Sequence, residues 1–499
     1  MVILFNPLST TPGKQPLPLS LMSLAAMLEG PPHDEQPRER WSLVDGNVLA
    51  DPAADIIARL SSIPASELAL LAVTVMPGPQ LTQAVSVCRR VKSVLPHVPI
   101  VWGGYFPTQH ADVVLRAPYV DFVIKTQGEH ALLQLVDTLR RRRPLNGVAN
   151  LSWKAIHEVV NNPVQAATPL DELPDLPYHR VDMGHYIHRN YLGARTVAHN
   201  SSFGCPFACS FCAVVAMSNR KWSAQSPARM ERVMRRLVST YGVDAVQMHD
   251  MDFFISEART AEFCERIADL NLRWWALGRV DTLMQYSDDT WAKMARSGLA
   301  MIFSGAESGT DAQLATMNKG GKAASSLTIE LAKRMRRYRI VPEFSFVLGC
   351  PPDPLADVAA NFSFIRRIKQ INPATEIVLY TYTPVPMEGA LYAEAQRAGF
   401  TFPDTLEGWA TPEWQQLSMR RGDNIPWVDQ GVRRRVRNFE RVINAYYPTV
   451  TDSRLTRWHR AALRAASAWR YRLQYYGAPL ELRALHRLIH YQRPETTGF

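Results

Sequence analysis

Short apolar runs alternate with helical patterns along most of this 499-residue chain. In the first third, the runs VILF, LALLAVTV, PIVWGG and VDFVIK are each followed by a loop and an amphipathic segment. Such alternation predicts an α/β fold with a doubly wound, mostly parallel sheet, whose ligands bind outside the carboxyl ends of the strands. We therefore expect residues 1–145 to form a Rossmann-like domain with a cleft around residues 76–80, 103–106 and 127–130.

The rest of the chain divides into three further segments. Residues 146–190 are rich in proline and lack sustained periodicity, which is typical of a linker. Residues 191–395 return to alternating strands and helices, and five or six such units predict a partial parallel (β/α)6 barrel. Residues 396–499 carry apolar side chains at helical spacing and predict a helical domain rich in arginine and aromatic residues.

Three of the six cysteines, Cys205, Cys209 and Cys212, form a C-x3-C-x2-C pattern in a loop-forming segment. Structural zinc usually takes two separated ligand pairs, and no second pair occurs in this chain, so zinc is disfavoured. Soft thiolates in one cluster favour an iron–sulfur centre, and three ligands for four irons leave one iron open. A fourth ligand from His199, Cys264 or Cys350 would close it.

The cysteine pattern, with Phe211 just before its third cysteine, resembles the signature of the radical S-adenosylmethionine (SAM) superfamily. The resemblance implies a [4Fe-4S] cluster on the three cysteines, with the open iron binding SAM. Later segments resemble the family's SAM contacts less specifically. The residues that this implies for SAM are Phe211, Asp250 or Asp252, Arg279, Glu307 and Ser308. For each, a structural role at a strand end is the alternative.

The first domain resembles the cobalamin-binding domain that precedes the radical domain in one large subgroup. The resemblance spans about residues 1–400 and implies that cobalamin is held by Thr74, Met76, Gly103, Gly104, Tyr105, Gln127, Gly128 and Glu129. The D-x-H-x-x-G motif that supplies a lower axial histidine elsewhere is absent. Cobalt would then be five-coordinate, water-bound or lightly contacted from below; a domain of this shape that binds nothing is the alternative.

These resemblances imply a cobalamin-dependent radical SAM enzyme that methylates an unactivated carbon of a small-molecule, lipid or natural-product substrate. A 5'-deoxyadenosyl radical would activate the substrate, methylcobalamin would donate the methyl group, and a flavodoxin or ferredoxin would supply electrons. One alternative is a ring-forming or oxidative cyclase that uses cobalamin without methyl transfer. Another is a non-catalytic cobalamin or electron-transfer protein. The pattern singles out no catalytic side chain, and we expect a monomer.

The positive charge of the chain is concentrated near its end. Between residues 431 and 472 there are eleven arginines against Glu440 and Asp452. Helices of this kind can cover a barrel, lie on an anionic membrane or bind nucleic acid. We expect these helices to cover the barrel. Peripheral contact with a membrane is a second possible role, and binding of nucleic acid is disfavoured. No signal peptide or membrane-spanning run is recognisable, which predicts a cytoplasmic protein.

Overall fold

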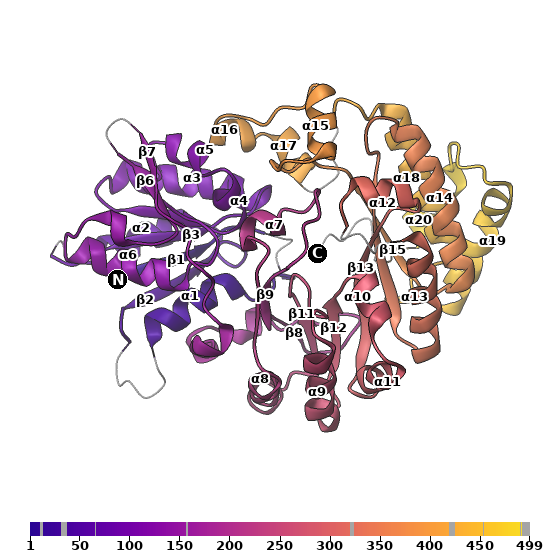
Figure 1. Ribbon diagram of the computed structural model, residues 1–499, viewed down its shortest axis with the longest axis horizontal. Helices are drawn as coiled ribbons and strands as arrows, with labels where there is room; N and C mark the ends of the chain where they lie inside the picture. The colour runs from indigo at the N-terminus through magenta and orange to yellow at the C-terminus, as the bar shows by residue number, and fades with distance from the viewer. Residues whose placement is uncertain are drawn as a thin grey trace.

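The computed structural model describes residues 1–9, 13–30, 37–64, 66–155, 158–319, 324–418, 425–452, 454–489 and 491. It confirms the α/β expectation: two sheets lie side by side, each covered by helices, and further helices follow at the carboxyl end (Figure 1). Within the described residues, no helix is both long and apolar enough to cross a membrane.

The first sheet has seven strands. In spatial order they are β2 (Trp41–Asp45), β1 (Val2–Asn6), β3 (Leu70–Thr74), β4 (Ile100–Gly103), β5 (Phe122–Ile124), β6 (Leu151–Lys154) and β7 (Val159–Asn161). The first five run parallel, and β6 and β7 add an antiparallel edge. The helices are α1 (Leu19–Glu29), α2 (Pro52–Ser61), α3 (Pro79–Val94), α4 (Tyr105–Gln109), α5 (Ala111–Arg116) and α6 (Glu129–Arg140).

Two apolar clusters hold this domain together, one on each face of the sheet. Ile3 and Phe5 point into one cluster, while Val2 and Leu4 point into the other. Side chains of a strand alternate between faces, so a sheet covered on both sides needs continuous apolar runs such as VILF.

The segment expected to be a linker begins with structure. β6 and β7 lie within residues 146–190, and the irregular stretch starts only after Asn161. Strands of three or four residues next to prolines are too short to show the alternation that reveals a strand in a sequence. The remaining linker carries three single-turn 3-10 helices, Leu170–Glu172, Tyr178–Arg180 and Met183–His185.

The second sheet is an open, all-parallel array of six strands, as expected for a partial barrel. Its order is β8 (Thr196–His199), β11 (Ala245–Met248), β12 (Arg273–Leu277), β13 (Leu299–Glu307), β14 (Val341–Leu348) and β15 (Glu376–Thr381). The covering helices are α8 (Pro227–Tyr241), α9 (Glu257–Ile267), α10 (Val280–Gln285), α11 (Asp288–Arg296), α12 (Asp311–Thr316), α13 (Ser325–Tyr338) and α14 (Pro354–Ile371). A short hairpin of β9 (Ser202–Gly204) and β10 (Trp222–Ala224) encloses α7 (Val214–Ser218).

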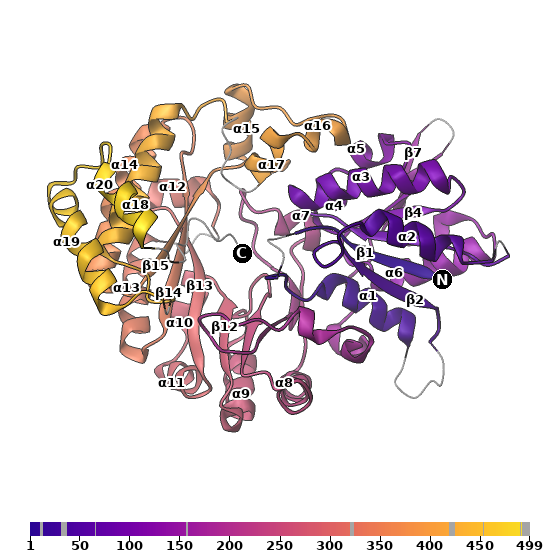
Figure 2. The same cartoon turned by 180° about the vertical axis from the view of Figure 1, so that it is seen from behind.

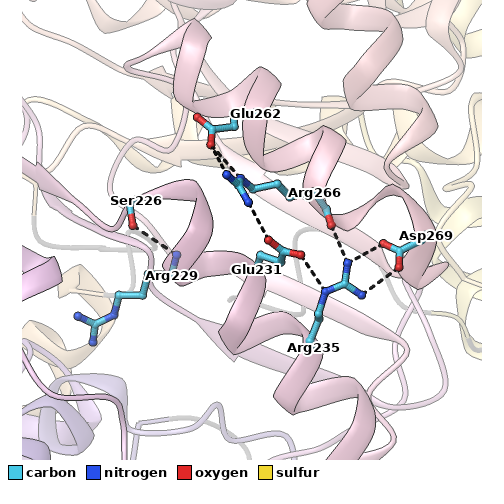
Figure 3. A network of polar contacts seen from close by, with 7 residues as sticks. All are labelled: Ser226, Arg229, Glu231, Arg235, Glu262, Arg266 and Asp269. Atoms are coloured by element: carbon cyan, nitrogen blue, oxygen red, sulfur yellow. Dashed lines mark hydrogen bonds and ion pairs between the residues drawn. The ribbon is translucent and has the colours of Figure 1, made fainter.

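An ion-pair network joins the outer surfaces of α8 and α9 (Figure 3). Arg235 contacts Glu231 at 2.9 Å and binds both carboxylate oxygens of Asp269 at 2.9 and 3.0 Å. Arg266 reaches Glu231 at 3.0 Å and Glu262 at 2.8 Å. Because the arginines are exposed, we expect this network to fix the relative position of two barrel helices more than to add stability.

The carboxyl-terminal part is helical, as expected. It contains α15 (Ala390–Arg397), α16 (Leu406–Trp409), α17 (Pro412–Ser418), α18 (Gln430–Tyr446), α19 (Arg457–Leu473) and α20 (Leu480–Leu488). α18, α19 and α20 pack beside α14 at the side of the barrel away from the first domain, whereas α15 to α17 lie above the space between the domains (Figures 1 and 2). α16 packs on α3, and Trp409 joins the core of the first domain.

Candidate functional site

The three clustered cysteines lie on the loop between β9 and α7, at one end of the barrel. Cys209 is 7% exposed, and Cys205 and Cys212 are partly exposed. Gly204 precedes the loop with a φ of +84°, and a Cβ there would lie 2.1 Å from the Lys221 carbonyl oxygen. Only glycine fits this close approach. Gly204 therefore marks the point at which the chain leaves the hairpin and the cysteine loop begins.

The segment after α12 holds the cysteine loop in place. The Ser210 backbone NH donates to the Met317 carbonyl at 3.0 Å, and the Asn318 side chain donates to the Ala208 carbonyl at 3.0 Å. Carbonyls and amides of a loop need such partners when water is excluded. Residues 317 and 318 carried no sequence signal for this role, because their contacts with the loop are made by backbone atoms and one amide.

All six cysteines are free thiols. Among the described residues, no three His, Cys, Asp or Glu side chains come close enough together to hold a single metal ion. Zinc requires such convergence, with sulfur about 2.3 Å from one ion. In an iron–sulfur cluster each cysteine binds a different iron, and the cluster on this loop stays a prediction.

The candidate fourth ligands sit in the core with other partners. His199 is fully buried, and its ring nitrogens lie 3.3 Å from the Tyr178 hydroxyl and 3.3 Å from the Gln225 amide oxygen. Cys264 and Cys350 are each 1% exposed. Burial raises the pKa of Cys264 to about 12 and that of Cys350 well above its usual value. Burial raises the pKa of the Cys205 thiol to about 12 as well, so the open fourth iron stays a prediction.

The two candidate aspartates have different surroundings. Asp250 accepts hydrogen bonds from the Ser201 NH at 3.1 Å and from the hydroxyls of Ser201 and Ser202 at 2.8 and 2.5 Å. Asp252 is 2% exposed and neither carboxylate oxygen makes a well-formed hydrogen bond, although Arg279 and the Phe254 backbone NH lie close enough to lower its pKa. An unpartnered buried carboxylate is costly unless a ligand satisfies it.

Burial raises the pKa of Asp252 to about 7. The positive charge of Arg279 lowers the pKa of Asp252, and the Asp252 carboxylate in turn raises the pKa of Cys205. A cationic ligand beside the cysteine loop would restore the ionised form and supply the missing partner. Asp250 fastens the end of β11 to Ser201 and Ser202, whereas a contact of Asp252 with the ammonium or sulfonium of SAM stays a prediction.

Arg279 lies against the cysteine loop. Its Nη1 donates to the Cys209 sulfur at 3.1 Å, and the guanidinium carbon lies 3.7 Å from the Phe207 ring centroid. Nε and Nη2 bind both carboxylate oxygens of Asp281 at 3.0 and 2.7 Å, and Nη2 also donates to the Lys319 carbonyl. These contacts give Arg279 structural partners, and its contact with the SAM carboxylate stays a prediction. No sequence pattern had indicated that Phe207, Asp281 and Lys319 would contact Arg279 beside the cysteine loop.

Glu307 and Ser308 close the end of β13. Glu307 has a φ of +63° and pairs with Lys319 at 3.1 Å, while the Lys319 ammonium also donates to the Gly305 carbonyl. Ser308 is fully buried and accepts from the Thr310 NH at 3.2 Å. Phe211 is partly buried against the barrel core. These contacts give Glu307 and Ser308 structural partners, and their contact with SAM stays a prediction.

In the first domain, the carboxyl ends of β3 and β4 form one part of the expected cobalamin cleft. Gly104 has φ +98° and ψ −159°, a backbone conformation available essentially to glycine alone. A Cβ there would lie 3.1 Å from the Thr74 hydroxyl oxygen and 3.3 Å from the Val75 nitrogen. Met76 is 52% exposed just beyond β3. Gly103 ends β4, and Tyr105 begins α4. The contact of these residues with cobalamin stays a prediction.

The other predicted cobalamin residues are tied to neighbouring elements. Gln127 exchanges hydrogen bonds with the backbone of Thr168, including one of 2.6 Å from the Thr168 NH. Glu129 accepts from the Ser23 hydroxyl at 2.6 Å, and burial raises its pKa. Gly128 lies against Leu24. Gln127 and Glu129 thus fasten the linker and α1, while any contact with a ligand stays a prediction.

His110 ends α4 but does not resemble a metal ligand. Its ring lies 4.9 Å from that of Phe106 and 4.7 Å from that of Trp409, and burial lowers its pKa to about 4. It therefore forms part of the contact between the first domain and α16. This arrangement agrees with the absence of a lower axial histidine motif.

The two candidate sites meet. α4, which begins at Tyr105, packs against α7, which begins two residues after Cys212 (Figure 1). Loops from the carboxyl-terminal part approach both: the Cβ expected at Gly389 would lie 3.2 Å from the Ser210 Cβ, and that at Gly78 would lie 3.6 Å from the Ser418 Cβ. The glycine turn of the first domain and the cysteine loop of the barrel therefore border one region.

Comparisons with known proteins relate the first sheet domain and the whole architecture to known families. Residues 7–136 match the family model of the B12 binding domain. The chain is 27% identical over 289 residues to the uncharacterized methyltransferase PH0819 of Pyrococcus horikoshii, covering 57% of this chain and 61% of that protein. It is 26% identical over 296 residues to the anaerobic magnesium-protoporphyrin IX monomethyl ester cyclase of Synechocystis, covering 57% and 56%. The chain spans less than two thirds of the length of these relatives.

Two solved structures share the architecture. The radical SAM methyltransferase TsrM from Kitasatospora setae, with cobalamin and a [4Fe-4S] cluster bound, superposes with a TM-score of 0.63 at 16% identity over 81% of this chain and 79% of that chain. The cobalamin-dependent SAM radical enzyme OxsB, with aqua-cobalamin bound, gives 0.67 at 18% identity over 98% and 75%. At these identities the likeness is one of fold. This chain thus contains a B12-binding domain and has the fold of cobalamin-dependent radical SAM enzymes.

Proposed function

We propose that this protein is a cobalamin-dependent radical SAM enzyme that methylates an unactivated carbon of a small-molecule, lipid or natural-product substrate. One observation carries the proposal: α4, directly after the glycine turn of the B12-binding domain, packs against α7, directly after the cysteine loop. A reaction that uses two cofactors on one substrate needs both within reach of the same atom. The contact between α4 and α7 supplies that proximity.

The chain's own residues would divide the work of binding. Cys205, Cys209 and Cys212 would hold a [4Fe-4S] cluster, and Asp252 would accept a hydrogen bond from the SAM ammonium. The edge formed by Met76, Gly104 and their neighbours would hold cobalamin. When bound, the cluster with SAM supplies hydrogen-atom abstraction, and cobalamin supplies a transferable methyl group.

Water exclusion is the second task of the protein. The loop before α15 approaches the cysteine loop at Ser210, and the end of α17 approaches the B12-binding domain at Gly78. These contacts place a cover over the region between the two sites (Figure 2). A cover of this kind protects reactive intermediates from side reactions with solvent.

The test needs no substrate. The protein is reconstituted anaerobically with iron, sulfide and hydroxocobalamin, reduced, and supplied with SAM that carries an isotopically labelled methyl group. We expect labelled methyl on the cobalamin and 5'-deoxyadenosine in solution. Cys212→Ser should lower the iron content and stop 5'-deoxyadenosine formation, whereas Cys264→Ala, at a core cysteine, should retain both. SAM turnover without either product would contradict the proposal.

The 26% identity to a cyclase favours a second candidate, a ring-forming or oxidative reaction in which cobalamin transfers no methyl group. The same experiment separates the two. A cyclase would cleave SAM to 5'-deoxyadenosine and methionine while the labelled methyl stayed on the methionine. Absence of label from cobalamin, with cluster and cobalamin both bound, would favour this reaction.

A further inference from the structure

α19 turns an apolar surface to the solvent. At about 100° per residue, Trp458, Trp469 and Leu473 fall within a sector of about 60° on this helix. They are 71%, 46% and 73% exposed. Ala462 lies within the same sector and is exposed, and exposed Ala465, Arg472 and Ala461 border it within about 60°. The opposite side is buried and carries Leu463, Ser467, Arg470 and Tyr471.

α20, which packs against α19, carries an exposed apolar stripe of its own. Leu480 and Leu488 are 64% and 79% exposed and lie within a sector of about 80°, with exposed Ala484 between them. Of twelve exposed large apolar side chains among the described residues, six lie between Trp458 and Leu488. Single exposed apolar residues are ordinary, but such a concentration on neighbouring helices marks an interaction surface.

A cavity of about 530 Å³ between α18 and α20 adds a site for negative charge. Among the residues that the structure describes, its lining consists of Arg434, Arg437, Arg441, Arg483 and Arg487, with Asn438 and His486. On α20, Arg483 and Arg487 lie next to the stripe formed by Leu480 and Leu488. The cavity is therefore lined by residues next to the apolar stripe of α20.

We propose that this surface, formed by α19, α20 and the arginine cavity, docks on an anionic phospholipid bilayer with a lipid phosphate in the cavity. A helix that lies in a bilayer interface combines an apolar face bearing Trp and Leu with flanking cations. α19 has five arginines and no acidic residue. The one acidic residue of α20, Glu481, is paired with Arg470.

Other partners match the surface less well. Nucleic acid would use the arginines but leave exposed Leu473, Leu480 and Leu488 without contacts. A second copy of this chain would bring arginines against arginines, because a two-fold interface apposes the same patch on both subunits. An anionic bilayer satisfies both the cations and the apolar side chains. The proposal is independent of the reaction that the protein catalyses.

The test measures binding of the full chain to vesicles by co-sedimentation. We expect binding to phosphatidylcholine vesicles that contain phosphatidylglycerol, little binding to pure phosphatidylcholine, and release near 1 M salt, where the Debye length is about 3 Å. Arg483→Gln with Arg487→Gln should weaken binding about 30-fold. Trp458→Ser with Leu473→Ser should weaken it at least tenfold, as estimated from about 25 cal/mol for each Å² of apolar area.

Matched controls remove the same chemistry elsewhere. Lys333→Gln with Arg397→Gln removes two exposed charges, and Val94→Ser with Leu355→Ser removes two exposed apolar side chains. Both should bind vesicles like the wild type. The substituted side chains are all at the surface, so circular dichroism and the unfolding midpoint should match the wild type in every variant.

Three results would overturn the proposal. One is wild-type protein that stays in solution with anionic vesicles. Another is binding that survives both the arginine and the Trp458/Leu473 substitutions. The third applies to protein that does not sediment with vesicles. In such protein, soluble glycerol phosphate would bind to the cavity, or light scattering would show a dimer that Trp458→Ser abolishes. These would assign the cavity to a soluble anion and the apolar face to a second copy.

Discussion

The guanidinium of Arg279 donates a hydrogen bond to the sulfur of Cys209 at 3.1 Å. Both side chains are buried, and Asp281 holds the guanidinium in place through two hydrogen bonds of 3.0 and 2.7 Å. Arg279 is distant from Cys209 in sequence, at the end of β12 and not on the cysteine loop. A fixed positive charge beside a cysteine that would bind iron favours the more negative, reduced form of a cluster.

Removing Arg279 should destabilise the protein through Asp281. Arg279→Gln leaves a buried carboxylate without its cation, and we expect a loss of about 3 kcal/mol in the free energy of unfolding. Urea unfolding of the metal-free protein measures this. Arg279→Gln with Asp281→Asn should recover most of the loss; equal instability of the single and double variants would show that Asp281 is not the cause.

The double variant also tests the effect of Arg279 on a bound cluster. Without the hydrogen bond and positive charge at Cys209, reduction should become harder. A charged hydrogen bond of about 1.5 kcal/mol corresponds to a midpoint potential roughly 60 mV more negative. A redox titration followed by electron paramagnetic resonance measures the shift. An unchanged potential with a fully loaded cluster would remove Arg279 from this role.

Asp252 and Asp250 should respond in opposite ways to the same substitution. Asp252→Asn removes an unpartnered buried carboxyl, so the metal-free protein should keep its stability while the cluster-loaded protein binds SAM at least tenfold more weakly. Asp250→Asn weakens three hydrogen bonds to Ser201 and Ser202 and should lower stability by about 1–3 kcal/mol. Calorimetry with SAM and urea unfolding separate the two effects. Full SAM affinity in Asp252→Asn would contradict the assignment.

Gly104 should tolerate no side chain. Its φ of +98° and ψ of −159° are strained for alanine, and a Cβ would press on Thr74 and Val75. We expect Gly104→Ala to lower the free energy of unfolding by about 3 kcal/mol and to reduce cobalamin retention, measured by absorbance after gel filtration. Gly147→Ala, in the same domain with no atom within 4 Å of its Cβ, should change neither quantity appreciably.

The burial of His110 predicts acid sensitivity of the contact between the first domain and α16. Its pKa falls from 6.5 to about 4 on folding, so the unfolded state takes up a proton more readily between these values. Stability from neutral His110 is fully present above pH 6.5 and decreases as the pH falls toward 4. The contribution lost between pH 7 and pH 5 is roughly 2 kcal/mol by this linkage.

Urea unfolding at the two pH values checks this prediction. His110→Gln removes the titrating group and should show a smaller loss of stability between pH 7 and pH 5 than the wild type. An identical pH dependence in both proteins would assign the acid sensitivity to another group.

The sequence by itself determined the architecture and the cysteine loop. Runs such as VILF are apolar without interruption because both faces of their sheet are covered, and the loop is local, held within eight residues from Cys205 to Cys212. The short strands β6 and β7 escaped detection because three or four residues carry too little periodicity.

Only the tertiary structure decided which polar side chains are available to a ligand. Asp250 and Asp252 look equivalent in HDMDFF, yet Ser201 and Ser202 donate three hydrogen bonds to the first, whereas the second makes no well-formed hydrogen bond. The partnership of Arg279 with Cys209, and the meeting of α4 with α7, join segments far apart in the chain. Periodicity and motif spacing report local conformation, whereas a buried charge acquires its partners only when strands and loops pack together.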